Sequence, residues 1–291
     1  MSEVRQNAVS PDEPGLAGLA RRGRRALSGR PGSRGGLPRL RLGLWLPPLI
    51  AFATLAGGWE LYARSHEFVL PTIEDIWGTL RDNPHLYWVN FLTTLREVAV
   101  GGALGIGAAF LLAVLMVELS IFERALMPLM IVLMVTPIVA IAPALVIAFG
   151  FGTMPKYLVT AIIVFYPMLV NSVAGLRDVD DAVLAVFTTL HANRLEVFRR
   201  LRVPSSLPFV FAGLRIAFPL AIVGATVAEF AAAGQQAGLG ALIQVAASQA
   251  NLAAIWASIL LLCLLGLALV MALAVIRKQV LFWDNAAQIR T

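Results

Sequence analysis

Six long apolar stretches divide the sequence, at about residues 43–62, 95–117, 125–149, 157–176, 206–230 and 254–276. Each comes close to the ~20 residues that an α-helix needs to cross roughly 30 Å of hydrocarbon. Only three of the intervening segments are long, namely 63–94, 177–205 and 231–253. The pattern therefore predicts an all-α membrane protein with six transmembrane helices, whose three longer loops carry any chemistry outside the bilayer.

The composition excludes an ordinary soluble enzyme. Hydrophobic residues make up 59% of the 291-residue chain and charged residues 14%, with a mean hydropathy of +0.80. A soluble domain is about 45–50% apolar and about 25% charged. The only cysteine, Cys263, lies in an apolar run, so a disulfide scaffold is excluded as well.

The excess positive charge is concentrated at the start of the chain. Residues 1–41 contain nine arginines and three acids, whereas the remainder carries 14 charges of each sign. A Gly/Pro/Arg-rich segment beside a span is typical of a disordered cytoplasmic tail that sets topology and touches anionic lipid, rather than of a nucleic-acid-binding surface. No signal peptide is evident before residue 42. We therefore distinguish this tail (1–42), a membrane domain (43–284) and a short cytoplasmic C-terminal tail (285–291).

The basic residues also predict orientation. If the N-terminus is inside, 18 of the 23 fall on the inner side and three, Arg64, Arg81 and Lys156, on the outer side. Arg96 and Arg215 lie within spans. Because inner loops of membrane proteins carry the excess of Lys and Arg, both termini and the 177–205 loop are expected in the cytoplasm.

Small residues and prolines indicate how the spans pack. Gly101 and Gly105 form a small-xxx-small face that lets another helix approach closely. Four prolines interrupt the predicted third and fourth spans, and each removes a backbone hydrogen bond: Pro128, Pro137, Pro143 and Pro167. Such interruptions are compatible with a transport pathway.

No group of residues in the sequence is suited to catalysis or to metal binding. The histidines fall in predicted loops: His66, His85 and His191. The acids in or near spans stand isolated: Glu60, Glu97, Glu118 and Glu229. A P-loop lysine directly follows glycine, but both lysines of this chain follow other residues. We therefore expect no catalytic residue, no metal and no cofactor, so any ATP hydrolysis belongs to a partner chain.

The 177–205 loop predicts two short helices. In the second, Asn193 can cap the helix while Glu196 returns the bond, as in a capping box. Pro204 is expected to end this helix.

An apolar ridge on the second helix suggests a docking surface. Leu195, Phe198 and Leu201 recur every three residues between four arginines. The ridge either docks into the groove of a partner, with Phe198 as its anchor, or packs at the membrane base with the arginines on lipid phosphates.

The loop and its surroundings resemble a known family. Aligned on Pro204, the loop matches the hydrophobic end of the pattern E-A-A-x3-G-x9-I-x-L-P, although Ala185 stands for the Glu and His191 for the Gly. A β-carbon penalises the left-handed conformation expected at His191. Further matching segments lie at 165–180, 209–215, 228–230 and 238–240. From about residue 43 to 284 the chain is similar to inner-membrane permeases of binding-protein-dependent ABC importers, nitrate/sulfonate/taurine branch.

The resemblance implies a bacterial inner-membrane importer with two permease chains, expected to be a homodimer. Two ATPase chains would dock on the cytoplasmic loop, and an external solute-binding protein would deliver the solute. By the same resemblance, the residues that couple to the ATPase are Asn193, Leu195, Glu196, Phe198, Leu201 and Pro204.

Several polar residues along the spans are candidates for the pathway: Thr136, Tyr166, Asn171, Ser172, Arg215, Thr226 and Glu229. The alternative is that they form hydrogen bonds between helices, and that Arg215 pairs with carbonyls or an acid. The sequence around Thr136–Pro137 is the first place at which we expect a gate.

The solute is left open between two groups. Residues 222–230 and 238–240 are most similar to permeases for riboflavin or a thiamine pyrimidine precursor. Sulfonate, taurine or nitrate is the alternative solute. An ion-driven secondary transporter and a non-transporting assembly subunit are further alternatives, although the former favours inverted repeats and intramembrane acids.

Overall fold

A computed structural model describes residues 42–66, 68–232 and 237–282, which are helical between short turns and contain no strand. The elements are α2 (Leu42–Ser65), α3 (Ile73–Asp82), α4 (Pro84–Glu118), α5 (Ser120–Val135), α6 (Ile138–Phe149), α7 (Thr153–Arg177), α8 (Asp181–Thr189), α9 (Arg194–Val197), the π-helix η1 (Phe198–Arg202), α10 (Val203–Ala231), α11 (Leu239–Ser248) and α12 (Leu252–Val280). The predicted all-α class is confirmed. The tails predicted at 1–42 and 285–291 lie outside the described residues, except for Leu42.

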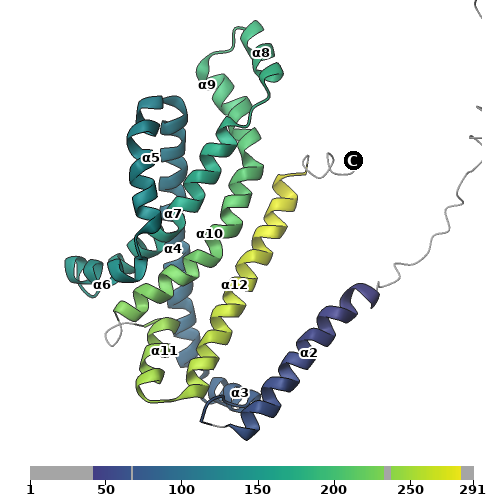
Figure 1. Ribbon diagram of the computed structural model, residues 1–291, viewed down its shortest axis with the longest axis vertical. Helices are drawn as coiled ribbons and strands as arrows, with labels where there is room; N and C mark the ends of the chain where they lie inside the picture. Colours follow the sequence, from purple (N-terminus) through teal and green to yellow (C-terminus); the bar gives the residue numbers. More distant parts are fainter. Residues whose placement is uncertain (1–41, 67, 233–236, 283–291) are drawn as a thin grey trace, which may run out of the picture. The chain divides into compact units, whose positions relative to one another are not determined.

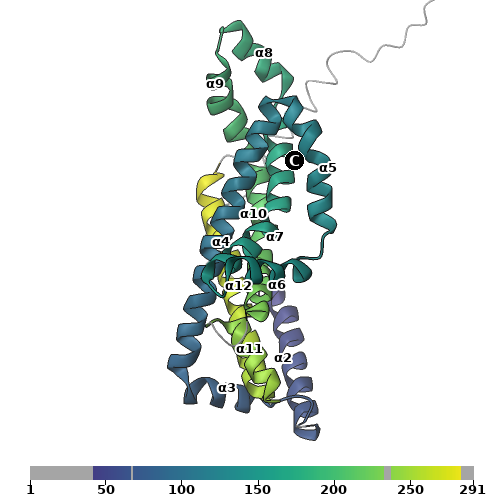
Figure 2. The same ribbon diagram turned by 90° about the vertical axis from the view of Figure 1, so that its left-hand side faces the viewer.

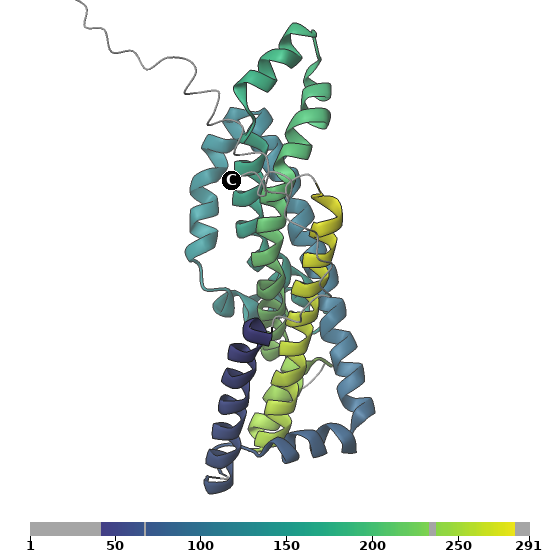
Figure 3. The same cartoon turned by 90° about the vertical axis from the view of Figure 1, so that its right-hand side faces the viewer.

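The chain divides into two compact units, one ending at Ala56 and the other beginning at Gly57. In the first unit, the side chains described in α2 are all exposed. In the second, α8 and α9 lie at one end and α3 and α11 at the other (Figures 1 and 3). The features described below all belong to the second unit.

The number of predicted spans is not confirmed. Among the described residues, four helical segments are long and apolar enough to cross a membrane: α4, α7, α12 and the continuous run Arg194–Ala231. The helices α5 and α6 pass this test only as a pair, bent by 98°. Figure 2 shows α6 turned across the neighbouring helices after α5. The structure therefore supports four or five spans, and α2, which covers the first predicted stretch, is not among them.

The predicted third span is broken at one of its three prolines. Thr136 and Pro137 both have extended backbone between α5 and α6. Pro128 and Pro143, by contrast, are accommodated inside these helices. Because the residue before a proline is pushed away from helical backbone, the break falls at Thr136.

The prediction that Pro204 ends the second loop helix is wrong. The helix that begins at Arg194 continues through η1 into α10, and Pro204 lies in the first turn of α10. In η1 the Val203 N–H bonds to the Phe198 carbonyl, five residues back. A π turn of this kind shifts the hydrogen-bonding register just before the proline, which has no N–H to donate.

Glycines allow α7 to pack closely between α4 and α10, its two most extensive neighbours. A β-carbon built on Gly101 would lie 2.6 Å from Thr160 Cβ, and one built on Gly105 would lie 2.8 Å from Ala161 Cα. On the other side, a β-carbon on Gly224 would lie 2.9 Å from Thr160 Cα. The predicted close approach at Gly101 and Gly105 is confirmed, and α7 is the helix that approaches.

Gly105→Ala should destabilise the chain, because the new methyl group would force α4 and α7 apart. Overpacking of this kind costs about 1–3 kcal/mol. We expect the thermal unfolding midpoint of the purified chain in detergent to fall by about 3–10 °C. Gly107→Ala is the control, since nothing lies within 4 Å of its added β-carbon. Equal midpoints for the two variants would contradict this packing.

Candidate functional site

The loop between α7 and α10 has the capped turn that the sequence predicts. Asn193 Oδ1 accepts from the Glu196 N–H at 2.8 Å, and the Asn193 N–H donates to Glu196 Oε2 at 2.9 Å. At the preceding turn, His191 has φ +53°. The pattern of the similar family has glycine at this position. His191 adopts the left-handed conformation expected of that glycine, although its own β-carbon penalises it. Asp180 caps α8 by accepting from the Ala182 N–H at 2.8 Å.

The three residues of the predicted ridge do not form one exposed surface. Leu195 is 70% exposed on α9, whereas Leu201 is half-buried. Phe198 is also half-buried, and it packs against a core cluster that contains Met116 of α4 and Met168 of α7. Leu190, at the end of α8, is 72% exposed. Leu190 and Leu195 are therefore the most exposed large apolar side chains of the α8–α9 tip, where Val186 and Val183 are exposed as well.

Two ion pairs join the base of this loop to the connection between α4 and α5. Arg177, at the end of α7, contacts both carboxylate oxygens of Glu123, at 2.8 and 2.5 Å. Arg202, in η1, contacts Glu118 at 3.0 Å. Arg177 is thus held to the first turn of α5 and Arg202 to the end of α4, although such partly exposed pairs contribute little to overall stability.

A hollow of about 480 Å³ lies beside the break between α5 and α6. Three predicted pathway residues line it: Thr136, Tyr166 and Asn171. Thr136 donates to the Val132 carbonyl and Asn171 to the Pro167 carbonyl, so both polar side chains are oriented by their own helices. No charged residue lines the hollow among the described residues.

The other pathway candidates lie elsewhere. Ser172 is fully buried, and its Oγ has no hydrogen-bond partner among the described residues. Thr226 donates to the Ile222 carbonyl of its own helix. Arg215 is exposed on α10. Glu229 is completely buried.

Glu229 belongs to a buried polar cluster that the sequence did not predict. Lys156 Nζ donates to Glu97 Oε1 at 2.8 Å and to the Ala237 carbonyl at 3.0 Å. Side-chain exposure is 0% for Lys156 and 1% for Glu97. Lys156 does not lie in a loop, as the sequence predicted, but in the first turn of α7, and the prediction that Glu97 and Glu229 are isolated is wrong.

The same cluster fixes the start of α11. Thr94 Oγ1 donates to Glu229 Oε1 at 2.7 Å and accepts from the Leu239 N–H at 2.9 Å. Glu229 Oε2 accepts from the Gly240 N–H, and Asn90 Oδ1 accepts from the Gly238 N–H. Gly238 has φ +145°, a conformation that residues with a β-carbon rarely adopt. In the sequence, the signals for this turn are Gly238, Gly240 and Glu229.

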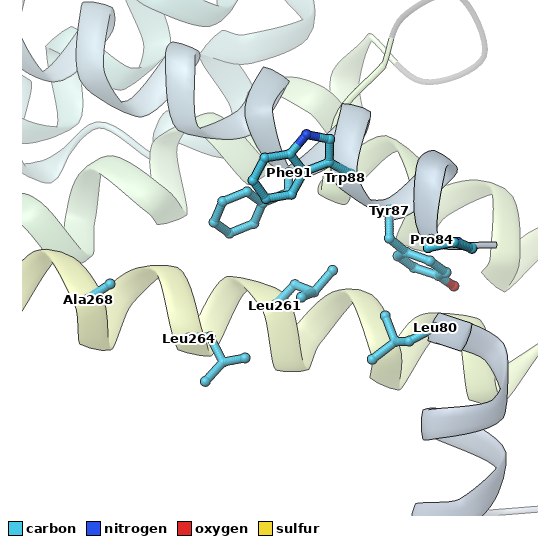
Figure 4. A pocket seen from close by; sticks show the side chains of 8 residues that line it. All are labelled: Leu80, Pro84, Tyr87, Trp88, Phe91, Leu261, Leu264 and Ala268. Atoms are coloured by element: carbon cyan, nitrogen blue, oxygen red, sulfur yellow. The ribbon is translucent and has the colours of Figure 1, made fainter. Parts of the chain in front are cut away.

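An apolar groove of about 460 Å³ opens between α4 and α12 (Figure 4). Tyr87, Trp88 and Phe91 line one side, and Leu261 and Leu264 belong to the facing helix. This groove offers few polar groups to orient a solute. No three His, Cys, Asp or Glu side chains in the described ranges are placed to hold a metal ion.

Comparison with known proteins identifies the class. Residues 101–281 match the model of the family "Binding-protein-dependent transport system inner membrane component". The chain belongs to this family, and it is a multi-pass membrane protein and a permease of the ABC-importer class. Membership of this family supports a transport role rather than an enzymatic one.

The relatives include permeases for different solutes. The formylaminopyrimidine transport permease protein of Halalkalibacterium halodurans is 34% identical over 80% of this chain and 92% of its own length. The riboflavin transport system permease protein of Chloroflexus aurantiacus is 33% identical over 56% of this chain and 60% of its own length. A putative aliphatic sulfonates transport permease protein of Bacillus subtilis is 26% identical over 84% of this chain and 88% of its own length. This range supports the resemblance to the nitrate/sulfonate/taurine branch.

Thr94→Val should destabilise the chain, because it removes the acceptor of the Leu239 N–H and the hydroxyl that donates to Glu229 Oε1. Two such losses cost about 2–4 kcal/mol, so the thermal unfolding midpoint should fall by about 5–10 °C. The neighbouring Thr93→Val removes only a bond to the Val89 carbonyl of the same helix. If both variants unfold at the same temperature, Thr94 does not hold α11.

Proposed function

We propose that the chain forms the translocation pathway of an ABC importer for a small uncharged heterocyclic solute, with riboflavin or a thiamine pyrimidine precursor favoured. A separate ATPase would power the cycle, an external binding protein would deliver the solute, and both termini would lie in the cytoplasm. The observation that carries this proposal is the capped loop between α7 and α10, which presents apolar side chains beyond the spans. Family membership favours this function over the ion-driven transporter and the assembly subunit.

The loop has the properties of a docking element for the ATPase. Leu195 is exposed on a short helix whose first turn is closed by the Asn193–Glu196 capping box. Because the capping box already orders the first turn, the loop loses less conformational entropy when a partner binds. The exposed leucine supplies apolar contact area. Phe198 would hold α9 against the core, and Pro204 would lie in the first turn of α10, where the helix continues from the loop.

Movement of the docked loop would reach the pathway through α5. Arg177 holds one loop stem to Glu123 in the first turn of α5, and Arg202 holds the other to Glu118 at the end of α4, just before α5. The other end of α5 is the break at Thr136–Pro137, beside the hollow. We propose that a shift of the loop moves α5 as a lever and changes the width of the hollow at this break.

The lining of the hollow supports an uncharged solute. An aromatic ring can stack on Tyr166, and Asn171 Oδ1 can accept a hydrogen bond from a ring N–H. No charged group in the described lining would pair with nitrate or a sulfonate. The alternative solutes nonetheless have one argument in their favour, because Arg215 is exposed on α10 and could pair with an anion.

Arg215 also supports a second permease chain. A charged side chain facing lipid within a span is costly, so the exposed face of α10 that carries Arg215 should be covered by protein or water. The apolar side chains Ile216 and Val223 are exposed on the same helix. We propose that a second copy of this chain covers this face around a shared pathway, whereas membrane lipid fills the apolar groove between α4 and α12.

The ATPase contact is tested by Leu195→Ala, which removes exposed area without disturbing the core. We expect about tenfold weaker retention of the ATPase on gentle purification, equivalent to about 1.4 kcal/mol, and a matching loss of uptake. Leu111→Ala is the control, since Leu111 is 67% exposed within α4. Leu190 is unsuitable as a control because it is exposed at the same tip. Unchanged retention and uptake in Leu195→Ala would refute the docking assignment.

The solute is tested by uptake in cells that produce the chain with its co-purifying ATPase and binding protein. One of the two radiolabelled heterocycles, formylaminopyrimidine or riboflavin, should be taken up, and taurine and nitrate should not compete with it. Arg215→Gln should leave heterocycle uptake intact. Uptake of taurine or nitrate that Arg215→Gln abolishes would instead establish the anion alternative.

A further inference from the structure

The charges of the buried cluster do not balance if all three ionisable groups are charged. Lys156 supplies one positive charge, whereas Glu97 and Glu229 would supply two negative charges. All three side chains are essentially inaccessible to solvent. An uncompensated charge in such a site is strongly destabilising, because neither water nor an opposite charge offsets it. One of the carboxyl groups should therefore be neutral.

The hydrogen bonds indicate which carboxyl group that is. Both oxygens of Glu229 accept from strong donors, the Thr94 hydroxyl and the Gly240 N–H. Glu97 Oε1 accepts from Lys156, but Glu97 Oε2 is buried without a donor among the described residues. Glu97 lies one turn along α4 from Thr94, which bonds to Glu229 Oε1, so the two carboxyl groups belong to the same buried cluster. Two carboxylates cannot bond to each other unless one of them carries a proton.

We propose that Glu97 holds a proton on Oε2 and donates it to the Glu229 carboxylate. The unpartnered oxygen then becomes a donor, and the cluster becomes neutral, with Lys156 offset by Glu229. The groups that face the pair are Asn90 and Thr94 from α4, Lys156 from α7 and the backbone of 237–240. This bound proton joins α4, α7 and α10 to the start of α11, independently of the solute and of the ATPase.

The proton is tested by infrared spectroscopy of the purified full-length chain at neutral pH. The natural chain should show the absorption of a protonated carboxyl group, and E97Q should lose it. E118Q is the control, because Glu118 pairs with Arg202 outside this cluster. E97Q should also reach the membrane at the normal level, since its amide can accept from Lys156 and donate to Glu229. A natural chain without the band, an E97Q chain that keeps it, or an E97Q chain that fails to accumulate would overturn the proposal.

A second substitution that restores the charge balance shows which glutamate carries the negative charge that offsets Lys156. K156M should lower the membrane level of the chain several-fold, because the Glu229 carboxylate would lose its counter-charge. Adding E229Q should restore the level, whereas adding E97Q should not. Rescue by E97Q, rescue by neither substitution, or a normal level of K156M alone would contradict the assignment of the charge to Glu229.

Discussion

A lysine and two glutamates buried among membrane-spanning helices must offset one another, because neither water nor lipid can stabilise them there. In this chain the three groups come from three helices: Glu97 from α4, Lys156 from α7 and Glu229 from α10. They determine how these helices align along their length, since a shift of one turn would separate the charges. The glycine contacts of α7 serve the same alignment by allowing the backbones to come close enough for the side chains to meet.

This arrangement separates a fixed part of the molecule from parts that can move. The cluster also binds the backbone of 238–240, so α11 is held to the three central helices. By contrast, α5 contacts its neighbours sparsely and ends at the extended residues Thr136 and Pro137. The proposed coupling uses this difference, because motion that enters at the α8–α9 loop can displace α5 while α4, α7 and α10 keep their alignment.

Sequence patterns predicted the features that depend on neighbouring residues. The capping box at Asn193 and the glycine face of α4 are of this kind, because spacings of three and four residues define them. The buried cluster could not be predicted in this way, since Lys156 and Glu97 are 59 residues apart. A lysine near the end of a span is also usually interpreted as an interfacial residue. The prediction that Pro204 ends a helix was wrong although it also used neighbouring residues. The rule that a proline ends a helix did not hold here, because the π turn of η1 lets the helix continue through Pro204.

Cysteine accessibility tests the proposed pathway most directly, because it distinguishes the hollow from the sealed core in adjacent residues. In a Cys263→Ala background, Asn171→Cys would line the hollow, whereas Ser172→Cys would lie at a fully buried position. We predict that a membrane-impermeant thiol reagent modifies the Asn171→Cys chain during transport, that the transported heterocycle slows this reaction, and that Ser172→Cys does not react. Equal reactivity at the two positions, or no protection of Asn171→Cys by the solute, would contradict a pathway beside the α5–α6 break.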